Sequence, residues 1–434
     1  MTCRTCKKFF RLTHRWLCVL LCVLMTMTVA ACNKTNEQDG TVTESQTESA
    51  SKTESEGVSE TVSETESESV SETSSETESE TLSEEEKNRL ADEAYLSTVT
   101  YLKFELTGKD EPYFVGRWFE KNLNGETHKV TTTDGSHLYF LVNGTTEINV
   151  NFTTNHRLKT PYFAYSIDGE TPVRQLITDP TVTLPDNGRH TVRIVADGLT
   201  ETEEKWAHER GFALKNITAG EGTVTGIKPT GKTIFFYGDS ITEGIRALNM
   251  NADSDGNSAT NAYTWYTAAA LGATPYYVGY GASGLLAPGS FSTLFNAIER
   301  LSVNRTVDSS EIASITPDVI VINHGANDAS QANIARFEAA LRSVIARLQE
   351  KYPGVEIVYM VPFLSAEHSI AQQEGEIIKQ VAAEIDGMHV VETADWDLTY
   401  TDGNLHPDVA GAKKAAEKLS AALTDIFGED FFAA

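Results

Sequence analysis

The stretch Thr233-Ile-Phe-Phe-Tyr-Gly-Asp-Ser-Ile-Thr242 begins with five consecutive β-branched or aromatic residues and then changes to small and polar ones. A short apolar run of this kind is typical of a strand that is buried on both faces. The Gly-Asp-Ser that follows places a hydroxyl directly after the strand, where Asp and Ser also suit the start of a helix. The stretch therefore predicts a buried strand that delivers Ser240 to the edge of a sheet.

Four further apolar runs follow this strand toward the C-terminus: Tyr276–Tyr280, Val319–Asn323, Glu356–Val361 and His389–Glu392. Between them, apolar residues recur every three or four positions, as in amphipathic helices, over residues 334–351, 369–386 and 408–427. Strands that alternate with helices predict an α/β domain over residues 232–434, with a parallel sheet covered by helices on both faces. Ligands bind such sheets at the carboxyl ends of the strands.

Residues 90–231 have a different pattern, because short runs of alternating apolar and polar residues are separated by turn sequences such as Asn143-Gly144. The runs are His137–Val142, Glu147–Phe152, Tyr162–Ile167, Thr181–Leu184 and His190–Val195. They predict a small antiparallel β-sandwich ahead of the α/β domain. The aromatic residues Tyr113, Phe114, Trp118 and Phe119 are candidates for a sugar-binding face, although core packing is the more common use of such side chains.

The first 31 residues have the order of a secretory signal peptide. Basic residues extend to Arg15, an apolar run covers Trp16 to Met25, and small residues follow. The sequence Val29-Ala-Ala-Cys32 resembles the lipobox of bacterial lipoproteins, in which the signal is removed before a cysteine that carries lipid. We therefore expect a lipoprotein held outside the cytoplasm, at the bacterial cell surface, by a lipid anchor on Cys32. Ordinary cleavage after a small residue is the alternative.

Residues 32–89 are predicted to be a disordered linker, because residues 41–86 consist almost entirely of Ser, Thr and Glu. All five cysteines lie within the first 32 residues, which excludes a disulfide framework or a cysteine nucleophile further along the chain. The formal net charge of -27 argues against a nucleic acid as partner.

The polar segments of the α/β domain contain the residue types that acyl transfer requires: a nucleophile, a base and donors for an oxyanion. They are Gly238-Asp-Ser-Ile-Thr242, Gly281-Ala-Ser-Gly284, His324-Gly-Ala-Asn-Asp328 and Asp402-Gly-Asn-Leu-His-Pro407. Ser240 can supply the nucleophile and His406 the base. The backbone N–H of Gly284 and the side-chain amide of Asn327 can donate to an oxyanion. Each residue also has an ordinary structural use: Ser240 as a helix cap, Asn327 in a turn, His406 as a surface histidine.

In order and context, these four segments resemble the four blocks of the SGNH (GDSL-like) hydrolase superfamily, and the resemblance covers residues 232–425. It implies Ser240 as the nucleophile and His406 as base and then acid. It further implies an oxyanion hole made by the N–H groups of Ser240 and Gly284 and the amide of Asn327.

The acidic member of the expected triad departs from the superfamily's usual spacing, which places it three residues before the histidine. Gly403 stands at that position, and Asp402 lies four residues before His406. We expect Asp402 to orient the imidazole. Asp395, Asp397 or a backbone carbonyl are the alternatives.

Gly279-Tyr-Gly-Ala-Ser-Gly284 has the spacing of a dinucleotide-binding fingerprint. It follows the second strand of the domain, however, and Pro288 interrupts the helix that would receive a pyrophosphate. The α/β domain also lacks an H-E-x-x-H sequence. We therefore expect neither a cofactor nor a catalytic metal.

A β-sandwich directly before an SGNH domain resembles carbohydrate esterase family two, and this resemblance implies that the sandwich is a small jelly-roll-like domain. Val115-Gly-Arg-Trp118 and Tyr165-Ser-Ile-Asp-Gly169 are local sequences that share this similarity. The resemblance implies a serine esterase that removes O-acetyl groups from extracellular or cell-surface carbohydrate. The alternatives are a lipase, thioesterase or lysophospholipase of the same superfamily, or a non-catalytic glycan-binding lipoprotein.

Overall fold

The computed structural model describes residues 82–309, 314–363 and 368–433. The predicted signal peptide, the predicted lipidation site at Cys32 and most of the predicted linker lie outside the described residues. The linker was expected to reach residue 89, but helix α2 (Glu84–Leu96) begins earlier. The Oγ atom of Ser83 accepts a hydrogen bond from the N–H of Glu86 at 3.1 Å. A serine cap followed by acidic residues favours a helix start, so the end of this Ser- and Glu-rich tract is helical.

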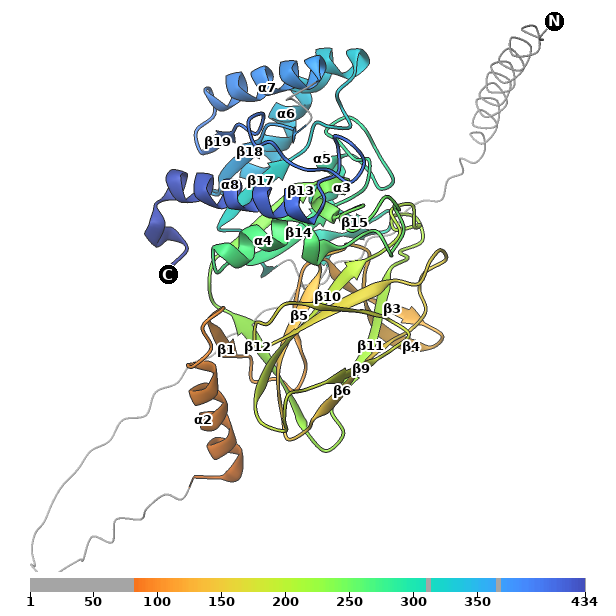
Figure 1. Ribbon diagram of the computed structural model, residues 1–434, viewed down its shortest axis with the longest axis vertical. Helices are drawn as coiled ribbons and strands as arrows, with labels where there is room; N and C mark the ends of the chain where they lie inside the picture. The colour runs from red at the N-terminus through yellow and green to blue at the C-terminus, as the bar shows by residue number, and fades with distance from the viewer. Residues whose placement is uncertain (1–81, 310–313, 364–367, 434) are drawn as a thin grey trace, which may run out of the picture. The chain divides into compact units, whose positions relative to one another are not determined.

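Two antiparallel sheets form the β-sandwich after α2 (Figure 1). The first has the order β1-β12-β5-β10-β7-β8, with β2 also paired to β5, and the second has the order β3-β4-β11-β6-β9. The first sheet consists of β1 (Phe104–Leu106), β12 (Thr223–Pro229), β5 (His137–Asn143), β10 (His190–Gly198), β7 (Tyr162–Ile167), β8 (Val173–Leu176) and β2 (Tyr113–Val115). The second consists of β3 (Trp118–Leu123), β4 (Glu126–Thr131), β11 (Phe212–Thr218), β6 (Glu147–Phe152) and β9 (Thr181–Thr183).

The C-terminal part is built on a parallel sheet with the order β14-β13-β17-β18-β19. Its strands are β13 (Thr233–Gly238), β14 (Thr274–Gly279), β17 (Val319–Asn323), β18 (Glu356–Met360) and β19 (Met388–Val391). Alternate residues point to opposite faces of the sheet. Phe235 and Tyr237 pack toward α5 (Leu294–Glu299), α6 (Gln331–Lys351) and α7 (Ser369–Ala382). Ile234 and Phe236 pack toward α4 (Tyr263–Ala270) and α8 (Val409–Phe427), which lie side by side in Figure 1. The predicted α/β class, with helices on both faces, is confirmed.

The smaller elements are α3 (Ser240–Glu243), η1 (Ala259–Asn261), β15 (Arg300–Ser302), β16 (Arg305–Thr306), η2 (Val307–Ser309) and η5 (Glu429–Phe431). The five expected strands of the parallel sheet and its three expected helices are present, with bounds that shift by a few residues. Sequence patterns missed several strands of the sandwich, above all β1, β2, β11 and β12. These strands are short or mix half-buried with exposed positions, so they have little apolar alternation.

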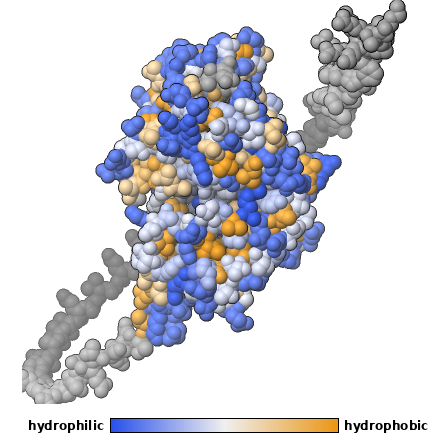
Figure 2. Space-filling model, in the orientation of Figure 1, coloured by the Kyte–Doolittle hydropathy of each residue, from blue (hydrophilic) through white to orange (hydrophobic). Residues whose placement is uncertain are grey.

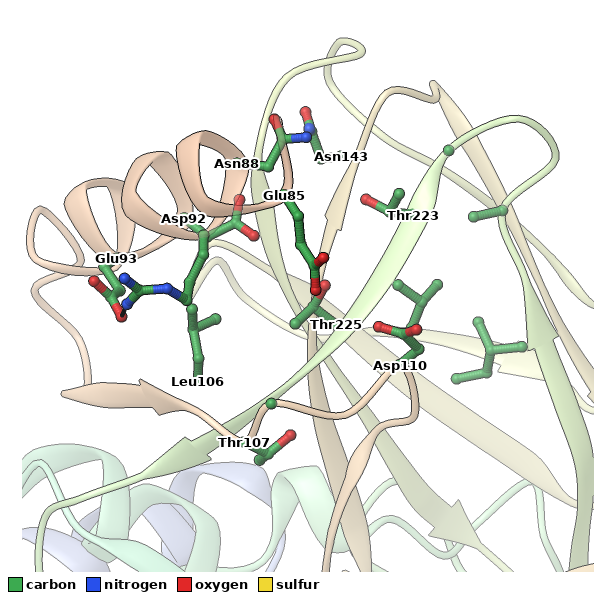
Figure 3. A pocket seen from close by; sticks show the side chains of 16 residues that line it. Glu85, Asn88, Asp92, Glu93, Leu106, Thr107, Asp110, Asn143, Thr223 and Thr225 are labelled. Atoms are coloured by element: carbon green, nitrogen blue, oxygen red, sulfur yellow. Dashed lines mark hydrogen bonds and ion pairs between the residues drawn. The ribbon is translucent and has the colours of Figure 1, made fainter. Parts of the chain in front are cut away.

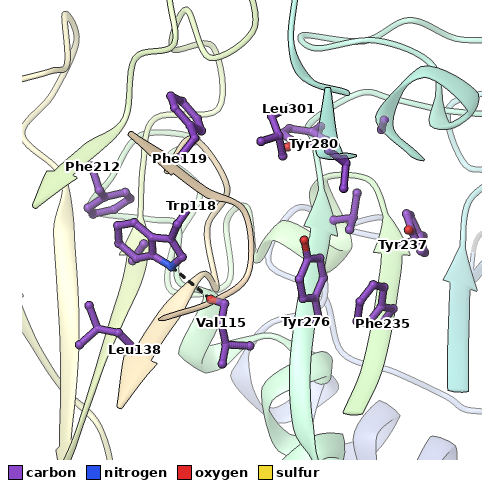
Figure 4. Close-up of a cluster of buried hydrophobic side chains, with 14 of the residues drawn as sticks. Val115, Trp118, Phe119, Leu138, Phe212, Phe235, Tyr237, Tyr276, Tyr280 and Leu301 are labelled. Carbon is purple, nitrogen blue, oxygen red and sulfur yellow. Dashed lines mark hydrogen bonds between the residues drawn. The ribbon is translucent and has the colours of Figure 1, made fainter. Parts of the chain in front are cut away.

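One hydrophobic cluster runs from the core of the sandwich to the parallel sheet (Figure 4). On the sandwich side it contains Trp118, Leu138 and Phe212, and on the other side Phe235 and Tyr276. Because this buried apolar surface is shared, the sandwich is packed onto the α/β part and is not joined to it by a linker alone.

The aromatic residues that were candidates for a sugar-binding face separate into two groups. Trp118 and Phe119 are buried in the shared cluster, so the sugar-binding hypothesis is wrong for Phe119. Trp118 also reaches the groove that the other two residues line. Tyr113 and Phe114 are half-buried and line a groove of about 530 Å³.

On the face shown in Figure 2, apolar residues occur in small groups among polar ones. Among the residues that the structure describes, no helix has both the length and the apolar character needed to cross a bilayer.

Candidate active site

Ser240 lies at the point where the connections of the parallel sheet change direction. The chain leaves β13 toward β14 on one side and later returns to β17 on the other side of β13. Such a switch opens a crevice at the carboxyl end of the strand. Asp239 caps α3 there, because its Oδ1 accepts a hydrogen bond from the N–H of Ile241 at 2.9 Å. The cap places Ser240 at the first residue of the helix, where its side chain is almost fully buried.

The structure brings Ser240, His406 and Asp402 together in one hydrogen-bonded relay. The Oγ atom of Ser240 lies 2.9 Å from Nε2 of His406, and Nδ1 of His406 lies 2.5 Å from Oδ2 of Asp402. A carboxylate beside Nδ1 keeps a proton on that nitrogen, which leaves Nε2 free to accept the proton of the serine hydroxyl. This is the arrangement that activates a serine nucleophile.

The loop before α8 accommodates the unusual spacing of Asp402 and His406. The N–H of Thr401 donates to the carbonyl oxygen of His406 at 2.9 Å, and the second carboxylate oxygen of Asp402 accepts the N–H of His406, also at 2.9 Å. Gly403 adopts a φ of 103°, a conformation that is rare for other residues, and so absorbs the extra residue. Of the carboxylates considered as alternatives, Asp397 contacts Lys414. Asp402 is therefore the carboxylate on the imidazole.

Burial alone would raise the pKa of Asp402, but hydrogen bonds from the backbone and side chain of His406 outweigh it. The guanidinium of Arg246 adds a further hydrogen bond at 3.0 Å, and the pKa falls to about 2. The carboxylate is thus ionised at neutral pH.

Two of the three predicted oxyanion donors are engaged within the protein. The N–H of Gly284 donates to the carbonyl oxygen of Ala287 at 2.8 Å. The amide nitrogen of Asn327 donates to Oδ2 of Asp239 and to the carbonyl oxygen of Ser283, both at 2.9 Å. In the described part of the chain, the N–H of Ser240 has no acceptor.

The predicted oxyanion hole of Ser240, Gly284 and Asn327 therefore stays a prediction, and it requires two of these donors to exchange partners. The neutral carbonyl oxygens of Ser283 and Ala287 now accept from these donors. A substrate oxygen must either share the N–H groups with them or displace them. Negative charge on that oxygen favours the exchange, because a charge-assisted hydrogen bond is stronger than a neutral one.

Asp328 holds the short hairpin that carries Gly284. Its carboxylate accepts the backbone N–H groups of Leu285, Leu286 and Ala287 at 2.6 to 2.9 Å. A Cβ atom on residue 284 would lie within 2.6 Å of this carboxylate, so only glycine fits there. Sequence reasoning gave Asp328 no role, since its partners lie more than forty residues away.

Arg246 is a second residue of the site that sequence reasoning missed. Its side chain reaches Asp402 from the loop after α3, and no local sequence pattern indicates such a pairing. Asp239 was also missed as a support of Asn327. Its position directly before Ser240 as a helix cap was the signal that could have identified it.

The Gly279–Gly284 segment is not a dinucleotide fingerprint in the structure. An isolated bridge joins Ser283 to Pro288, and the next helix, α5, begins only at Leu294. Among the described residues, no group of three or more His, Cys, Asp or Glu side chains is arranged to hold a metal ion.

A groove of about 930 Å³ lies away from these residues, between α2 and β12 (Figure 3). Carboxylates of Glu85, Asp92, Glu93 and Asp110 line it, together with polar groups and a few aliphatic side chains. It contains none of the relay residues.

The comparisons with known proteins agree with the fold. Residues 236–414 match the model of the GDSL-like lipase/acylhydrolase family. A family two carbohydrate esterase from Clostridium thermocellum, solved with cellohexaose, is 21% identical, with a TM-score of 0.58 over 73% of this chain and 99% of that chain.

An acetyl xylan esterase from the rumen bacterium Butyrivibrio proteoclasticus is 17% identical, with a TM-score of 0.60 over 76% of this chain and 100% of that chain. A salicylyl-acyltransferase from a tetracycline biosynthetic pathway is 16% identical, with a TM-score of 0.52 over 75% of this chain and 99% of that chain. No match was found among curated protein sequences. At these identities the structural similarities show a shared fold that spans both parts of the chain.

Proposed function

Residues 236–414 form a GDSL-like lipase/acylhydrolase domain, and from this premise we propose that the protein is a serine esterase that removes O-acetyl groups from carbohydrate. The observation that carries the proposal is the relay from Ser240 through His406 to Asp402, with contacts of 2.9 and 2.5 Å. A non-catalytic glycan-binding protein has no need for these contacts. The choice of carbohydrate is supported by the fold, since this chain covers nearly the whole length of family two carbohydrate esterases, sandwich included.

In the proposed reaction, the Oγ of Ser240 attacks the carbonyl carbon of the ester while Nε2 of His406 takes the hydroxyl proton. The negative charge that develops on the carbonyl oxygen meets the N–H of Ser240 and, after exchange, the donors of Gly284 and Asn327. His406 then gives its proton to the departing sugar hydroxyl, and an acetyl group remains on Ser240. Water attacks this acyl-enzyme with His406 again as base, which releases acetate and restores the serine.

We further propose that the protein is anchored outside the cytoplasm through lipid on Cys32. The support is the lipobox-like Val29-Ala-Ala-Cys32 and the Ser/Thr/Glu-rich tract after it. Such a tether would present an esterase to polymeric carbohydrate at the cell surface.

The experiment that tests the proposed activity measures acetate release from acetylated xylan and acetylated cello-oligosaccharides, beside hydrolysis of short- and long-chain nitrophenyl esters. We expect acetate from the glycans and a strong preference for the short ester, both lost in Ser240→Ala. Preference for the long-chain ester would instead support a lipase. Transfer of the acyl group to an added alcohol, in place of release to water, would indicate an acyltransferase.

A further inference from the structure

The residue that holds Asp402 on the imidazole is itself held by the β-sandwich. Oδ2 of Asp402 accepts from Nδ1 of His406 and from Nη1 of Arg246, so the guanidinium and the imidazole meet at one oxygen atom. A carboxylate with a second fixed donor is restrained in its orientation. Arg246 therefore limits the positions from which Asp402 can orient the base.

The backbone conformation of Arg246 needs support from residues further along the chain. It adopts a φ of 59°, a left-handed conformation that is unfavourable for a residue with a Cβ. Its backbone N–H donates to Oδ1 of Asn257 at 2.9 Å, and this bond fixes the conformation. Asn257 is fully buried, and its amide nitrogen donates to the carbonyl oxygens of Leu199 at 2.8 Å and Ala252 at 3.1 Å. Leu199 directly follows strand β10 of the sandwich.

The end of β10 also holds the same loop, by hydrogen bonds to a buried carboxylate. Asp197 is fully buried and accepts hydrogen bonds from the hydroxyl of Ser258 at 3.0 Å and from the N–H and hydroxyl of Thr260 at 2.8 and 2.6 Å. It also forms an ion pair with Nε of Arg174 on β8. The other end of that guanidinium donates to the carbonyl oxygens of Ser254 and Asn257 at 2.9 and 2.8 Å.

The approach between the sandwich and this loop is as close as the backbone allows. A Cβ atom on residue 198 would lie within 3 Å of the carbonyl oxygens of Asn257 and Ser254, so Gly198 is required for the contact. The buried Asp197 carboxylate and the part-buried Arg174 guanidinium satisfy one another, three backbone groups and two hydroxyls. They make a rigid junction, because separating its members would leave the buried carboxylate without partners.

We propose that the β-sandwich is a working part of the catalytic site, in which Asp197 and Arg174 fix the loop from Arg246 to Thr260 so that Arg246 holds Asp402 against His406. Asn257 is the positioning residue that connects the two ends of this chain of contacts. The inference rests on the proposed serine esterase activity and gives the sandwich a role in it beside any contact with substrate.

A double-mutant cycle between Asn257→Ala and Arg246→Gln tests the inference in the full-length protein. The readouts are kcat and KM for nitrophenyl acetate and the rate at which a fluorophosphonate labels Ser240. Labelling forms the Ser240 O–P bond, releases fluoride and passes the hydroxyl proton to His406, so it reports the relay without any carbohydrate. We expect each single variant to lower kcat and the labelling rate roughly tenfold with KM little changed, and the double variant to be no worse than Arg246→Gln alone within about twofold.

Two further variants complete the design. Thr260→Val keeps the side-chain shape and removes one hydroxyl bond to Asp197, so it tests the same junction if Asn257→Ala does not fold. We expect it to lower kcat and labelling in the same direction. Arg305→Gln breaks a different contact between the two parts, the 2.8 Å pair with Glu209, and is expected to leave kcat unchanged.

If the loss of kcat in the double variant equals the product of the two single losses, the inference is overturned, because the two residues would then act independently. A rise in KM in place of a fall in kcat would also overturn it, since Arg246 would then contact substrate. A parent protein that neither hydrolyses esters nor labels at Ser240 would overturn the proposed function and this inference with it. A reactive parent with multiplying losses would overturn the inference alone.

Discussion

Replacing Asp402 by Asn tests the relay most directly, because the substitution keeps the shape and changes one oxygen to an NH₂ group. If the amide oxygen takes the place of Oδ1, that oxygen still accepts a hydrogen bond from the backbone N–H of His406. In the parent, this nitrogen lies 2.9 Å from Oδ1. The NH₂ group then faces Nδ1 of His406 and Nη1 of Arg246, both of which are donors. The imidazole relieves the conflict by moving its proton to Nε2, and it then no longer accepts the proton of Ser240.

The opposite orientation of the amide is also unfavourable. It would restore an acceptor for Nδ1 but place two N–H donors against each other at the backbone of His406, which has no second tautomer. It would also remove the negative charge that stabilises the imidazolium. The same substitution in a serine protease triad lowers kcat by ~10⁴, and we expect a loss of that order here. At 1.36 kcal/mol per factor of ten, this corresponds to about 5 kcal/mol of transition-state stabilisation.

The assay is steady-state hydrolysis of nitrophenyl acetate near pH 7, with the fold checked by circular dichroism. Asp397→Asn is the matched control: it makes the same chemical change at an exposed carboxylate that contacts Lys414, and it should leave kcat unchanged. If Asp402→Asn keeps a kcat within about threefold of the parent, the orienting group is not Asp402 and the reasoning is wrong.

The pKa of Asp402 adds a second readout for the same variant. Its folded value of about 2 lies below the usual ~3.9 of an unfolded Asp. Ionised Asp402 therefore favours the folded state above about pH 4, and this contribution disappears as the pH falls toward 2. We expect the free energies of unfolding of parent and Asp402→Asn to converge over that interval, as measured by urea titration. A difference that stays constant down to pH 2 would contradict the assigned pKa.

Other predictions address the remaining parts of the protein. Ser240→Ala should lower kcat at least ~10³-fold, and near-parental activity would place the nucleophile elsewhere. Asn327→Ala should cost less, roughly 10²- to 10³-fold in kcat, because backbone donors remain; an unchanged kcat would exclude this amide from the oxyanion hole. Cys32→Ala should release the protein from membranes in a fractionation experiment, whereas unchanged membrane binding and processing would refute the lipid anchor. Lys205→Met leaves Glu243 buried without its ion-pair partner, since both side chains are fully inaccessible. It should lower the free energy of unfolding by about 3–5 kcal/mol in urea titration, and the double variant with Glu243→Leu should recover much of that loss.

Strand β17 and helix α6 show what local pattern can predict. The expected strand Val319–Asn323 has the bounds found in the structure, and the expected helix ends at Lys351 as observed. Four consecutive apolar residues with β-branched side chains, Val319 to Ile322, have little alternative to a buried strand, and apolar spacing of three and four specifies one face of a helix. Ser240 and His406 could be identified for a related reason, because each follows or precedes such an element directly.

Strands β1, β2, β11 and β12 show where local pattern fails. Each gains its stability from a neighbour far along the chain, as when β1 pairs with β12 more than a hundred residues later. The apolar alternation within such a strand is too weak to identify it, because cross-strand contacts supply most of what stabilises it.

The sequence by itself therefore determined the α/β class and the sandwich ahead of it, and it singled out Ser240 and His406 as candidates for nucleophile and base, since each depends on residues that are neighbours along the chain. Only the tertiary structure decided which carboxylate faces His406, that Arg246 meets it from 156 positions away, and that Gly284 and Asn327 are engaged with carbonyl groups. It also decided that Asp197 and Arg174 of the sandwich form hydrogen bonds with the loop from Arg246 to Thr260. The physical reason is that loop hydrogen bonds depend on how the sheets pack against one another, and a buried polar group takes whichever partner that packing brings within reach.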